Sequence, residues 1–248
     1  MGELSLSLKE RTVLNRETKN INTSVNLENE VKTNCIDRSN IKKRKSFLFK
    51  AIKRTFDIAF SVLALIVCAP ILLVVCIIIP IDSKGSAFYA HKRVGYNGND
   101  FKMLKLRSMY SQTDNHQVQL SDEQIEMLKK EYKLREDPRI TRIGRFIRKT
   151  SIDEIPQFIN IIKGDMSLVG PRPLVEDELT FYEGKKELLL SVKPGLTGYW
   201  QAYARNDATY QSGERQKMEL FYVENQGVLL DIKIILKTVG TILKKNGC

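Results

Sequence analysis

Residues 58–81 read IAFSVLALIVCAPILLVVCIIIPI, an apolar run without a single charged side chain. As a continuous α-helix this run would extend roughly 36 Å at ~1.5 Å per residue, enough to cross the hydrocarbon core of a bilayer. A buried helix of a soluble protein is the alternative, but a helix that is apolar on every side for this length is rare in a chain of 248 residues. The run therefore predicts a membrane segment.

Basic residues lie on both sides of this run. The positive-inside tendency keeps such flanks in the cytoplasm, which one straight crossing cannot do. Pro70, at the middle of the run and preceded by Ala69, removes a helix hydrogen bond and predicts a kink. A re-entrant helix over residues 47–82 that enters and leaves on one face satisfies both observations, and a Pro-kinked spanning helix is the alternative. The flanking residues are Lys42, Lys43, Arg44, Lys45, Lys50, Lys53 and Arg54 before the run, and Lys84, Lys92, Arg93, Lys102, Lys105 and Arg107 after it.

Composition narrows the class of protein. The length suits one substantial domain, alone or with an appendage. The 40 Lys and Arg against 29 Asp and Glu give a net charge of +11, which indicates an anionic partner such as nucleic acid, phosphate-bearing substrates or an acidic membrane face. The four cysteines have no Cys-x-x-Cys spacing, so we expect reduced thiols.

The first 46 residues differ from the rest in composition. They are rich in Asn, Lys, Glu and Ser and have no sustained apolar period, so we expect a disordered polar and basic tail over residues 1–46. No apolar segment stands at the start, so a cleaved secretory signal is not expected.

Residues 88–109, FYAHKRVGYNGNDFKMLKLRSM, follow the membrane segment. Their alternation, with Gly and Asn at the centre, predicts a short hairpin or an extended segment. Its basic residues would share a surface, and Lys105 and Arg107 are candidates for phosphate binding. A charge run that faces solvent or lipid headgroups is the alternative.

Residues 150–173, TSIDEIPQFINIIKGDMSLVGPRP, place Asp153 and Glu154 side by side before an apolar stripe at helical spacing that Gly164 ends. We expect a helix of about three turns. Ser151 and Glu154 match a capping box, so the acids could serve only to cap this helix. The same helix N-terminus would also stabilise an ionised carboxylate nucleophile and a phosphate docked beside it.

The wider surroundings favour chemistry over capping. Arg172 follows the acids, and a cluster of basic residues precedes them. Planar guanidinium groups suit diphosphate oxygens, and a divalent ion or arginines can hold two adjacent carboxylates together. The two histidines, His91 and His116, are interpreted as incidental. The basic residues before the acids are Arg139, Arg142, Arg145, Arg148 and Lys149.

Four ordered segments carry a family resemblance: KRTFDIAFSVLALIVCAPILL (53–73), HKRVGYNGNDFKMLKLRSM (91–109), DPRITRIGRFIRKTSIDEIPQFINIIKGDMSLVGPRP (137–173) and KPGLTGYWQAYARND (193–207). The chain resembles the monotopic phosphoglycosyl transferases, the bacterial sugar transferases that start polysaccharide and glycan assembly, exopolysaccharide and capsule included, on polyprenyl phosphate. The resemblance runs from about Lys53 to about Lys244. The chain departs from the family's usual pattern at Ala69, where Ser is frequent, and at Ala204, where Gly is frequent.

This resemblance implies a mainly α fold with a small β element, in a monotopic membrane protein with one Pro-kinked re-entrant helix and interfacial amphipathic helices. Residues 83–248 would form a cytoplasmic catalytic domain at the bacterial plasma (inner) membrane. The segment LLDIKIILKTVGTILKK (229–245) is amphipathic and basic, as expected of a helix that lies on anionic membrane lipids. Trp200 and Tyr199 are either membrane-interface anchors or core residues, and core packing is favoured.

The resemblance also implies a two-step exchange. The carboxylate of Asp153 attacks the sugar-linked phosphorus of a UDP-sugar and UMP leaves; polyprenyl (undecaprenyl) phosphate then takes the phosphosugar. Glu154 would bind Mg²⁺. Phosphoryl transfer needs positioning and charge neutralisation more than a strong base, so carboxylate, metal and arginines suffice. Arg148 and Arg172 match basic positions near the family's active site and are candidates for binding substrate phosphates, with structural pairing to a carboxylate as the alternative. Pro171 and Pro173 would fix the loop that aims Arg172, and Lys105 and Arg107, proposed above from the charge pattern, complete the candidate substrate-binding residues.

Two other classes of protein stay open. One is a non-catalytic, membrane-anchored basic binding module, which the charge alone supports. No nucleic-acid-binding motif accompanies that charge, so nucleic acid is not an expected partner. The other is a polytopic sugar-phosphate transferase, which would need several apolar spans where one is present. The identity of the sugar and the formation of a homo-oligomer are open.

Overall fold

The structure is a computed structural model that describes residues 47–110, 119–132, 134, 136–204 and 208–243, so the expected disordered tail and His116 lie outside the described residues. The described part is mostly helical with two small sheets, which confirms the predicted mainly α fold with a small β element. The elements are α2 (Phe47–Asp82), β1 (Phe88–Val94), η2 (Tyr96–Gly98), β2 (Asp100–Leu106), α3 (Asp122–Glu131), α4 (Arg142–Lys149), η3 (Ile152–Glu154), α5 (Gln157–Lys163), β3 (Ser167–Val169), η4 (Glu176–Tyr182), α6 (Lys186–Leu190), β4 (Gly195–Thr197), α7 (Tyr199–Tyr203), α8 (Glu214–Asn225) and α9 (Val228–Leu243).

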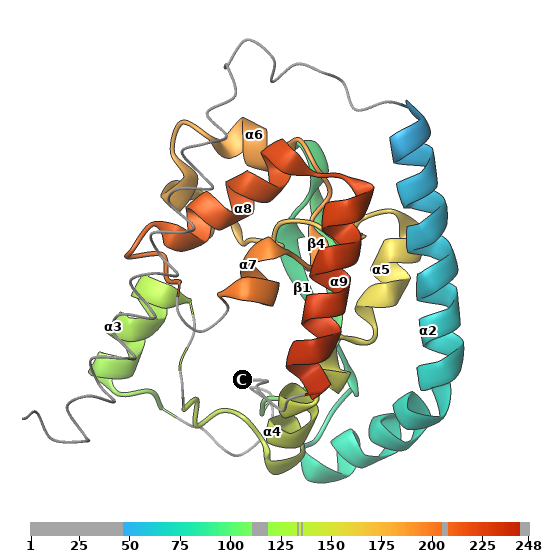
Figure 1. Cartoon of the computed structure of the whole chain (residues 1–248). Helices are drawn as coiled ribbons and strands as arrows, with labels where there is room; N and C mark the ends of the chain where they lie inside the picture. Colours follow the sequence, from blue (N-terminus) through green and yellow to red (C-terminus); the bar gives the residue numbers. More distant parts are fainter. Residues whose placement is uncertain (1–46, 111–118, 133, 135, 205–207, 244–248) are drawn as a thin grey trace, which may run out of the picture. The chain divides into compact units, whose positions relative to one another are not determined.

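Helix α2 contains the whole predicted apolar run. Its most apolar window has a mean hydropathy of 3.4, and only 11% of that window is buried. Within the described ranges it is the one helix long and apolar enough to cross a membrane. Its ribbon changes direction in the second half, and the other elements lie on the inner side of this bend (Figure 1). An uncovered apolar outer surface is compatible with monotopic membrane insertion. The re-entrant path and the kink at Pro70 stay predictions.

Lys53, near the start of α2, contacts three other elements: β3, α8 and α9. Lys53 donates to the carbonyl of Val169 in β3 (3.0 Å) and forms an ion pair with Asp231 of α9 (2.6 Å). The hydroxyl of Tyr222 in α8 donates to the other oxygen of Asp231 (2.8 Å). Lys53 therefore fixes the start of α2 against β3, α8 and α9 at once.

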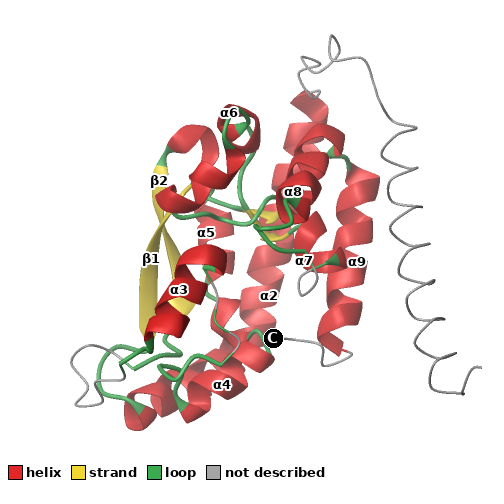
Figure 2. Ribbon diagram, turned by 90° about the vertical axis from the view of Figure 1, so that its left-hand side faces the viewer, coloured by secondary structure: helices red, strands yellow, loops and turns green. Residues whose placement is uncertain are grey.

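The next two charged residues of α2 bind backbone groups of α5 and β3. Arg54 donates to the carbonyls of Ile161 (2.6 Å) and Ile162 (2.8 Å), in the last turn of α5. Asp57 is buried and accepts the amide of Leu168 in β3 (3.1 Å). The C-terminal carbonyls of a helix lack intrahelical partners and carry partial negative charge, so a guanidinium is favoured there. Helix α5 accordingly lies along α2 in both views (Figures 1 and 2).

The predicted hairpin is present as the antiparallel strands β1 and β2 (Figure 2). Its register pairs Tyr89 with Lys105 and His91 with Met103. Successive side chains of a strand alternate between the two faces, so Lys105, His91 and Arg93 share one face of the hairpin. This basic face is the surface on which the candidate site is built.

Three apolar clusters make up the core. The first lies between the end of β1, η4, α6 and α8; the second between β2, β3, α5, α7, α8 and α9. The third joins the second half of α2 to β2 and α4 through Ile79, Leu106 and Ile147. Trp200 is 8% exposed and its Nε1 donates to the carbonyl of Ala208 (3.0 Å), so its predicted core position is confirmed.

Helix α9 has the predicted amphipathic pattern. Ile234 is fully buried, whereas Leu229, Ile232 and Leu236 are exposed. Because these side chains recur at helical spacing, they form one apolar stripe along α9. No other element covers this stripe within the described residues. Contact of this stripe with lipid stays a prediction.

Replacement of Asp231 with Leu tests the anchor at the start of α2. The change leaves the ammonium of Lys53 without its carboxylate, so the free energy of unfolding should fall by roughly 2–4 kcal/mol. Thermal and denaturant unfolding of the purified protein in detergent measure this loss. Glu126→Gln, which removes the exposed ion pair with Lys130, is the control and should leave the unfolding midpoint unchanged. An unchanged midpoint for Asp231→Leu would contradict the anchor.

Candidate active site

The two acids lie in η3, one turn before α5. Ser151 adopts the left-handed conformation (φ 58°), and its side chain makes no capping hydrogen bond. The capping box predicted for Ser151 and Glu154 is therefore wrong, because the left-handed backbone does not direct the hydroxyl to the third amide. Pro156 stands at the N-cap of α5, which has 7 residues, so this helix is also shorter than the three turns expected.

Lys105 of β2 meets both acids. Its Nζ lies 2.9 Å from Oε1 of Glu154 and 3.9 Å from Oδ2 of Asp153. Arg148, near the end of α4, donates through Nε to the hydroxyl of Ser108 (2.8 Å) and lies close enough to act on the Asp153 carboxyl. The structure thus brings together four residues that the sequence singled out as candidates: Lys105, Arg148, Asp153 and Glu154.

Asp153 is more enclosed than its neighbour. The side chain of Asp153 is 9% exposed, while that of Glu154 is 23% exposed. Burial raises the pKa of Asp153 to about 6, against the lowering effect of Lys105; Glu154 raises this pKa and Arg148 lowers it. The enclosed carboxylate is ionised at neutral pH and poorly solvated, which suits a nucleophile.

His91 occupies the same face of the hairpin as Lys105. Its Nδ1 lies 3.2 Å from Nη2 of Arg93. A guanidinium only donates, so Nδ1 accepts and the proton of the neutral ring is on Nε2. Burial, followed by Arg93 and Lys105, lowers the pKa of His91, so the ring is neutral at neutral pH. The interpretation of His91 as incidental to the chemistry stays a prediction.

The loop that carries Arg172 is pinned by its backbone. The carbonyl of Pro171 accepts the amide of Gly195 (2.8 Å), and the carbonyl of Pro173 accepts Nη1 of Arg93 (3.3 Å). The guanidinium of Arg172 makes no hydrogen bond or ion pair with the part of the chain that the structure describes. Arg172 acts electrostatically on both Arg93 and His91, so it lies near the basic face of the hairpin.

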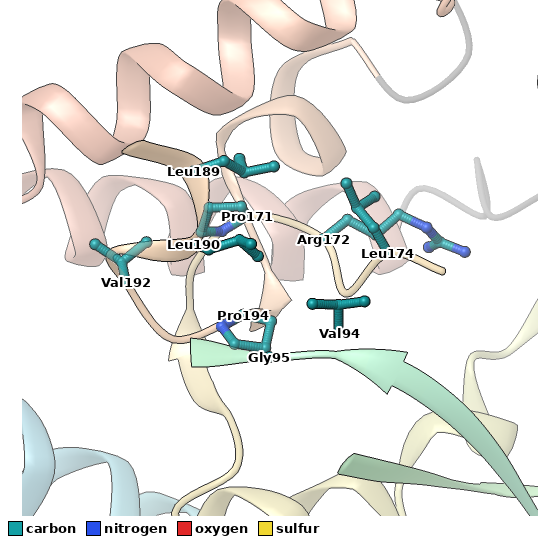
Figure 3. Close-up of a pocket in the computed structure, with 9 residues that line it drawn as sticks. All are labelled: Val94, Gly95, Pro171, Arg172, Leu174, Leu189, Leu190, Val192 and Pro194. Carbon is teal, nitrogen blue, oxygen red and sulfur yellow. The ribbon is translucent and has the colours of Figure 1, made fainter. Parts of the chain in front are cut away.

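An apolar hollow lies beside this loop (Figure 3). The Arg172 guanidinium points away from the apolar side chains of the hollow (Figure 3). Neither Asp153 nor Glu154 lines the hollow. Its lining residues are Val94, Gly95, Pro171, Arg172, Leu174, Leu189, Leu190, Val192 and Pro194.

Arg107, a sequence candidate for substrate binding, binds backbone instead in this structure. Its guanidinium donates to the carbonyls of Ser83 (2.6 Å), Lys84 and Gly85 (3.0 Å), directly after the end of α2. These carbonyls follow a helix end, where a guanidinium stabilises unpaired acceptors. Contact between Arg107 and a substrate stays a prediction.

Asp153 and Glu154 are the carboxylates available for a cation at this site. Among the described residues no group of three or more His, Cys, Asp and Glu side chains is arranged to hold a metal ion. Mg²⁺ is commonly held by one or two carboxylates together with substrate phosphates and water. Two adjacent carboxylates, Asp153 and Glu154, are a donor set of this kind, so the residues present fit a Mg²⁺ ion.

Most of the chain matches a known protein family. The family model described as "Bacterial sugar transferase" matches residues 48–245. The "Exopolysaccharide production protein ExoY" of Sinorhizobium fredii is 41% identical over 198 residues, which are 79% of this chain and 87% of that protein.

Two longer relatives have more specific names. The "Undecaprenyl-phosphate galactose phosphotransferase" of Salmonella typhimurium is 42% identical over 213 residues, which cover 85% of this chain and 44% of that protein. A relative in Aeromonas hydrophila, the "UDP-N-acetylgalactosamine-undecaprenyl-phosphate N-acetylgalactosaminephosphotransferase", is 34% identical over 209 residues, 81% of this chain and 45% of that protein. The chain spans less than half the length of these two relatives.

Gly170→Ala tests whether the Arg172 loop needs its close backbone packing. A Cβ at Gly170 would lie 2.4 Å from the carbonyl oxygen of Lys193 and 2.7 Å from the amide of Gly195, so β3 and β4 would have to separate. We expect a lower unfolding temperature and loss of transferase activity. Gly240→Ala in α9 is the control, because its Cβ would meet nothing within 4 Å and alanine favours helix. Equal behaviour of the two variants in unfolding and activity assays would refute the packing argument.

Proposed function

Because the chain belongs to the bacterial sugar transferase family, we propose that it is a phosphoglycosyl transferase that moves a sugar 1-phosphate from a UDP-sugar to undecaprenyl phosphate and releases UMP. The observation that carries this proposal is the enclosed Asp153 beside Glu154, with Lys105 and Arg148 around it. The names of the Salmonella and Aeromonas relatives describe transfer of this kind. The product would begin the assembly of an exopolysaccharide, capsule or related glycan.

In the first step Asp153 is the nucleophile. A carboxylate oxygen of Asp153 forms a bond to the sugar-linked phosphorus, while the bond from that phosphorus to the bridging oxygen breaks and UMP departs with the electron pair. The burial of Asp153 supports this role, because a poorly solvated carboxylate needs little desolvation before attack. Lys105 and Arg148 would offset the negative charge that gathers around the phosphorus.

In the second step the phosphosugar moves from Asp153 to the lipid acceptor. A phosphate oxygen of undecaprenyl phosphate attacks the same phosphorus, the acyl phosphate bond breaks, and Asp153 returns as a carboxylate. The product is undecaprenyl diphosphate sugar. No proton has to be removed from an ionised phosphate acceptor, so the mechanism needs no general base.

The diphosphate of the substrate needs cationic partners. Glu154 would hold Mg²⁺, which supplies charge neutralisation for the phosphate oxygens. Arg148 lies near Asp153, and Arg172 has a guanidinium without a partner in the described residues, so both can bind phosphate oxygens through paired N–H groups. Pro171 and Pro173 restrict the loop that aims Arg172.

The surfaces next to the site support a placement at the membrane. We place α2 as a re-entrant helix kinked at Pro70, with the active site on the cytoplasmic side of the plasma membrane where UDP-sugars are found. Helix α4 packs against α2, and its Phe146 is 59% exposed. Three basic residues, Arg142, Arg145 and Lys149, are exposed on the same helix, which supports contact with anionic lipid headgroups.

Asp153→Asn tests the proposed reaction. The amide preserves the shape of the side chain but is not an anionic nucleophile, so UMP release should fall by about 10³-fold or more. UMP is measured with purified protein, Mg²⁺, undecaprenyl phosphate and a panel of UDP-sugars that includes galactose and N-acetylgalactosamine. Without acceptor, the unmodified protein should release UMP in a burst no larger than the amount of enzyme.

The control for this substitution is Asp100→Asn, which changes an exposed carboxylate on the same domain. Asp100→Asn should retain normal turnover. Near-normal turnover of Asp153→Asn would eliminate the covalent mechanism, and absence of UMP with every sugar and added lipid would eliminate the proposed reaction.

Reporter cysteines test the path of α2. In a background that lacks the native thiols, cysteines at Ser46 and Ser86 should both resist an impermeant reagent in intact cells and react after permeabilisation. Ala69→Leu combined with Pro70→Leu should restore a continuous helix and expose position 46. Pro80→Leu, at the other proline of α2, is the control and should leave both positions protected. Labelling of position 46 in intact cells before any change of Pro70 would reject the re-entrant path.

A further inference from the structure

Glu178 is a buried acid that lies outside the site yet holds the loop of Arg172. It is 3% exposed and lies in η4. One of its oxygens, Oε2, accepts Nη1 of Arg93 (3.0 Å) and the backbone amide of Val175 (2.8 Å). Arg93 also donates through Nη1 to the carbonyl of Pro173 (3.3 Å). Glu178 and Arg93 together therefore hold the backbone on the C-terminal side of Arg172.

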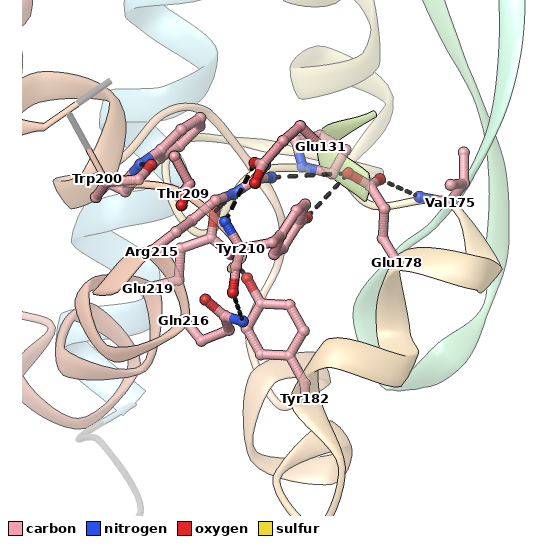
Figure 4. Close-up of polar contacts among 12 residues, drawn as sticks. Glu131, Val175, Glu178, Tyr182, Trp200, Thr209, Tyr210, Arg215, Gln216 and Glu219 are labelled. Atoms are coloured by element: carbon pink, nitrogen blue, oxygen red, sulfur yellow. Dashed lines mark hydrogen bonds and ion pairs between the residues drawn. The ribbon is translucent and has the colours of Figure 1, made fainter. Parts of the chain in front are cut away.

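The other oxygen of Glu178, Oε1, contacts Tyr210 and Arg215 (Figure 4). Oε1 accepts the hydroxyl of Tyr210 (2.9 Å), and Nη2 of Arg215 lies 3.8 Å away. The Arg215 guanidinium lies 3.9 Å from the ring centroid of Tyr210 and 4.1 Å from that of Trp200. A carboxylate with both oxygens engaged cannot rotate, so its contacts with Arg93 and Val175 keep one geometry.

The charges explain why this position is an acid. Arg93 and Arg172 are cations that lie close together: burial and then Arg172 lower the pKa of Arg93, while Glu178 raises it. Without the carboxylate, the buried Arg93 guanidinium would be uncompensated and would repel Arg172.

We infer that Glu178 is a positioning residue for substrate binding, which through Arg93 and the Pro173–Val175 backbone keeps the Arg172 guanidinium at the basic face of the hairpin. The inference rests on the proposed function, since it assigns Arg172 to the phosphates of the donor. A purely structural role makes a different prediction: loss of the buried partner of Arg93 would lower the stability of the protein, while the catalytic constants of the molecules that fold would stay unchanged. Folded Glu178 variants would then retain normal kinetics.

A double-mutant cycle separates these two roles. Glu178→Gln should raise KM for the UDP-sugar and lower kcat/KM by about tenfold in the otherwise unmodified protein. In the Arg172→Lys background, where the fork-shaped contact is already lost, the same change should alter kcat/KM by no more than about twofold. UMP release gives the kinetics, and thermal unfolding with near-UV circular dichroism verifies that each variant is folded.

Tyr182→Phe is the matched control, because it removes a hydrogen bond to Glu219 in the same buried cluster without touching the loop. Its effects on kcat/KM should be the same in both backgrounds. Arg93→Lys is the second variant if Glu178→Gln does not fold. It keeps the positive charge but loses the guanidinium N–H groups that contact the carbonyl of Pro173 and Nδ1 of His91. Its effect on kcat/KM should likewise be large with Arg172 present and small in the Arg172→Lys background.

Three results would overturn the inference: normal kinetics of both the Glu178 and Arg93 variants, equal losses in the two backgrounds, or no effect of Arg172→Lys itself. None of these results bears on whether the protein transfers a phosphosugar. That question is decided by Asp153→Asn and by UMP release from the unmodified protein, so failure of the inference and failure of the proposed function can be distinguished.

Discussion

The polar contacts of Lys53, Arg54 and Asp57 on the inner surface of α2 hold the rest of the structure in position. Apolar contact alone cannot fix the rotation and register of this helix, because the burial of apolar surface is non-directional. Hydrogen bonds to specific backbone groups have one satisfying geometry. Arg54 binds the end of α5, while Lys53 and Asp57 bind successive backbone groups of β3.

These two elements are the ones that carry the site. The acids directly precede α5, and the loop of Arg172 directly follows β3. Helix α2 therefore sets the position of both the carboxylates and the loop through the elements to which it binds. The hairpin completes the arrangement, because alternation along its strands directs Lys105 to the acids and Arg93 to the loop from a single face.

Part of the site could be predicted from short-range patterns. Adjacent carboxylates, a following Pro-Arg-Pro and basic residues at strand spacing were enough to single out Asp153, Glu154, Arg172 and Lys105 as candidates. The same kind of reasoning failed for Ser151, whose left-handed backbone breaks the capping box that its spacing allowed. It also did not find Glu178, since nothing near this residue in sequence distinguishes a buried acid from the exposed acids around it.

The sequence by itself determined the long apolar helix, the mainly α fold, the hairpin and the pair of adjacent acids, because hydropathy, periodicity and neighbouring residue types are local properties of a chain. Only the tertiary structure decided which charge meets which partner. Lys105 and Arg107 are two residues apart at the end of β2, yet the first pairs with Glu154 and the second binds the carbonyls that follow α2. The partner of a long cationic side chain depends on the segments that folding brings within a few ångströms, and chain separation does not encode that distance.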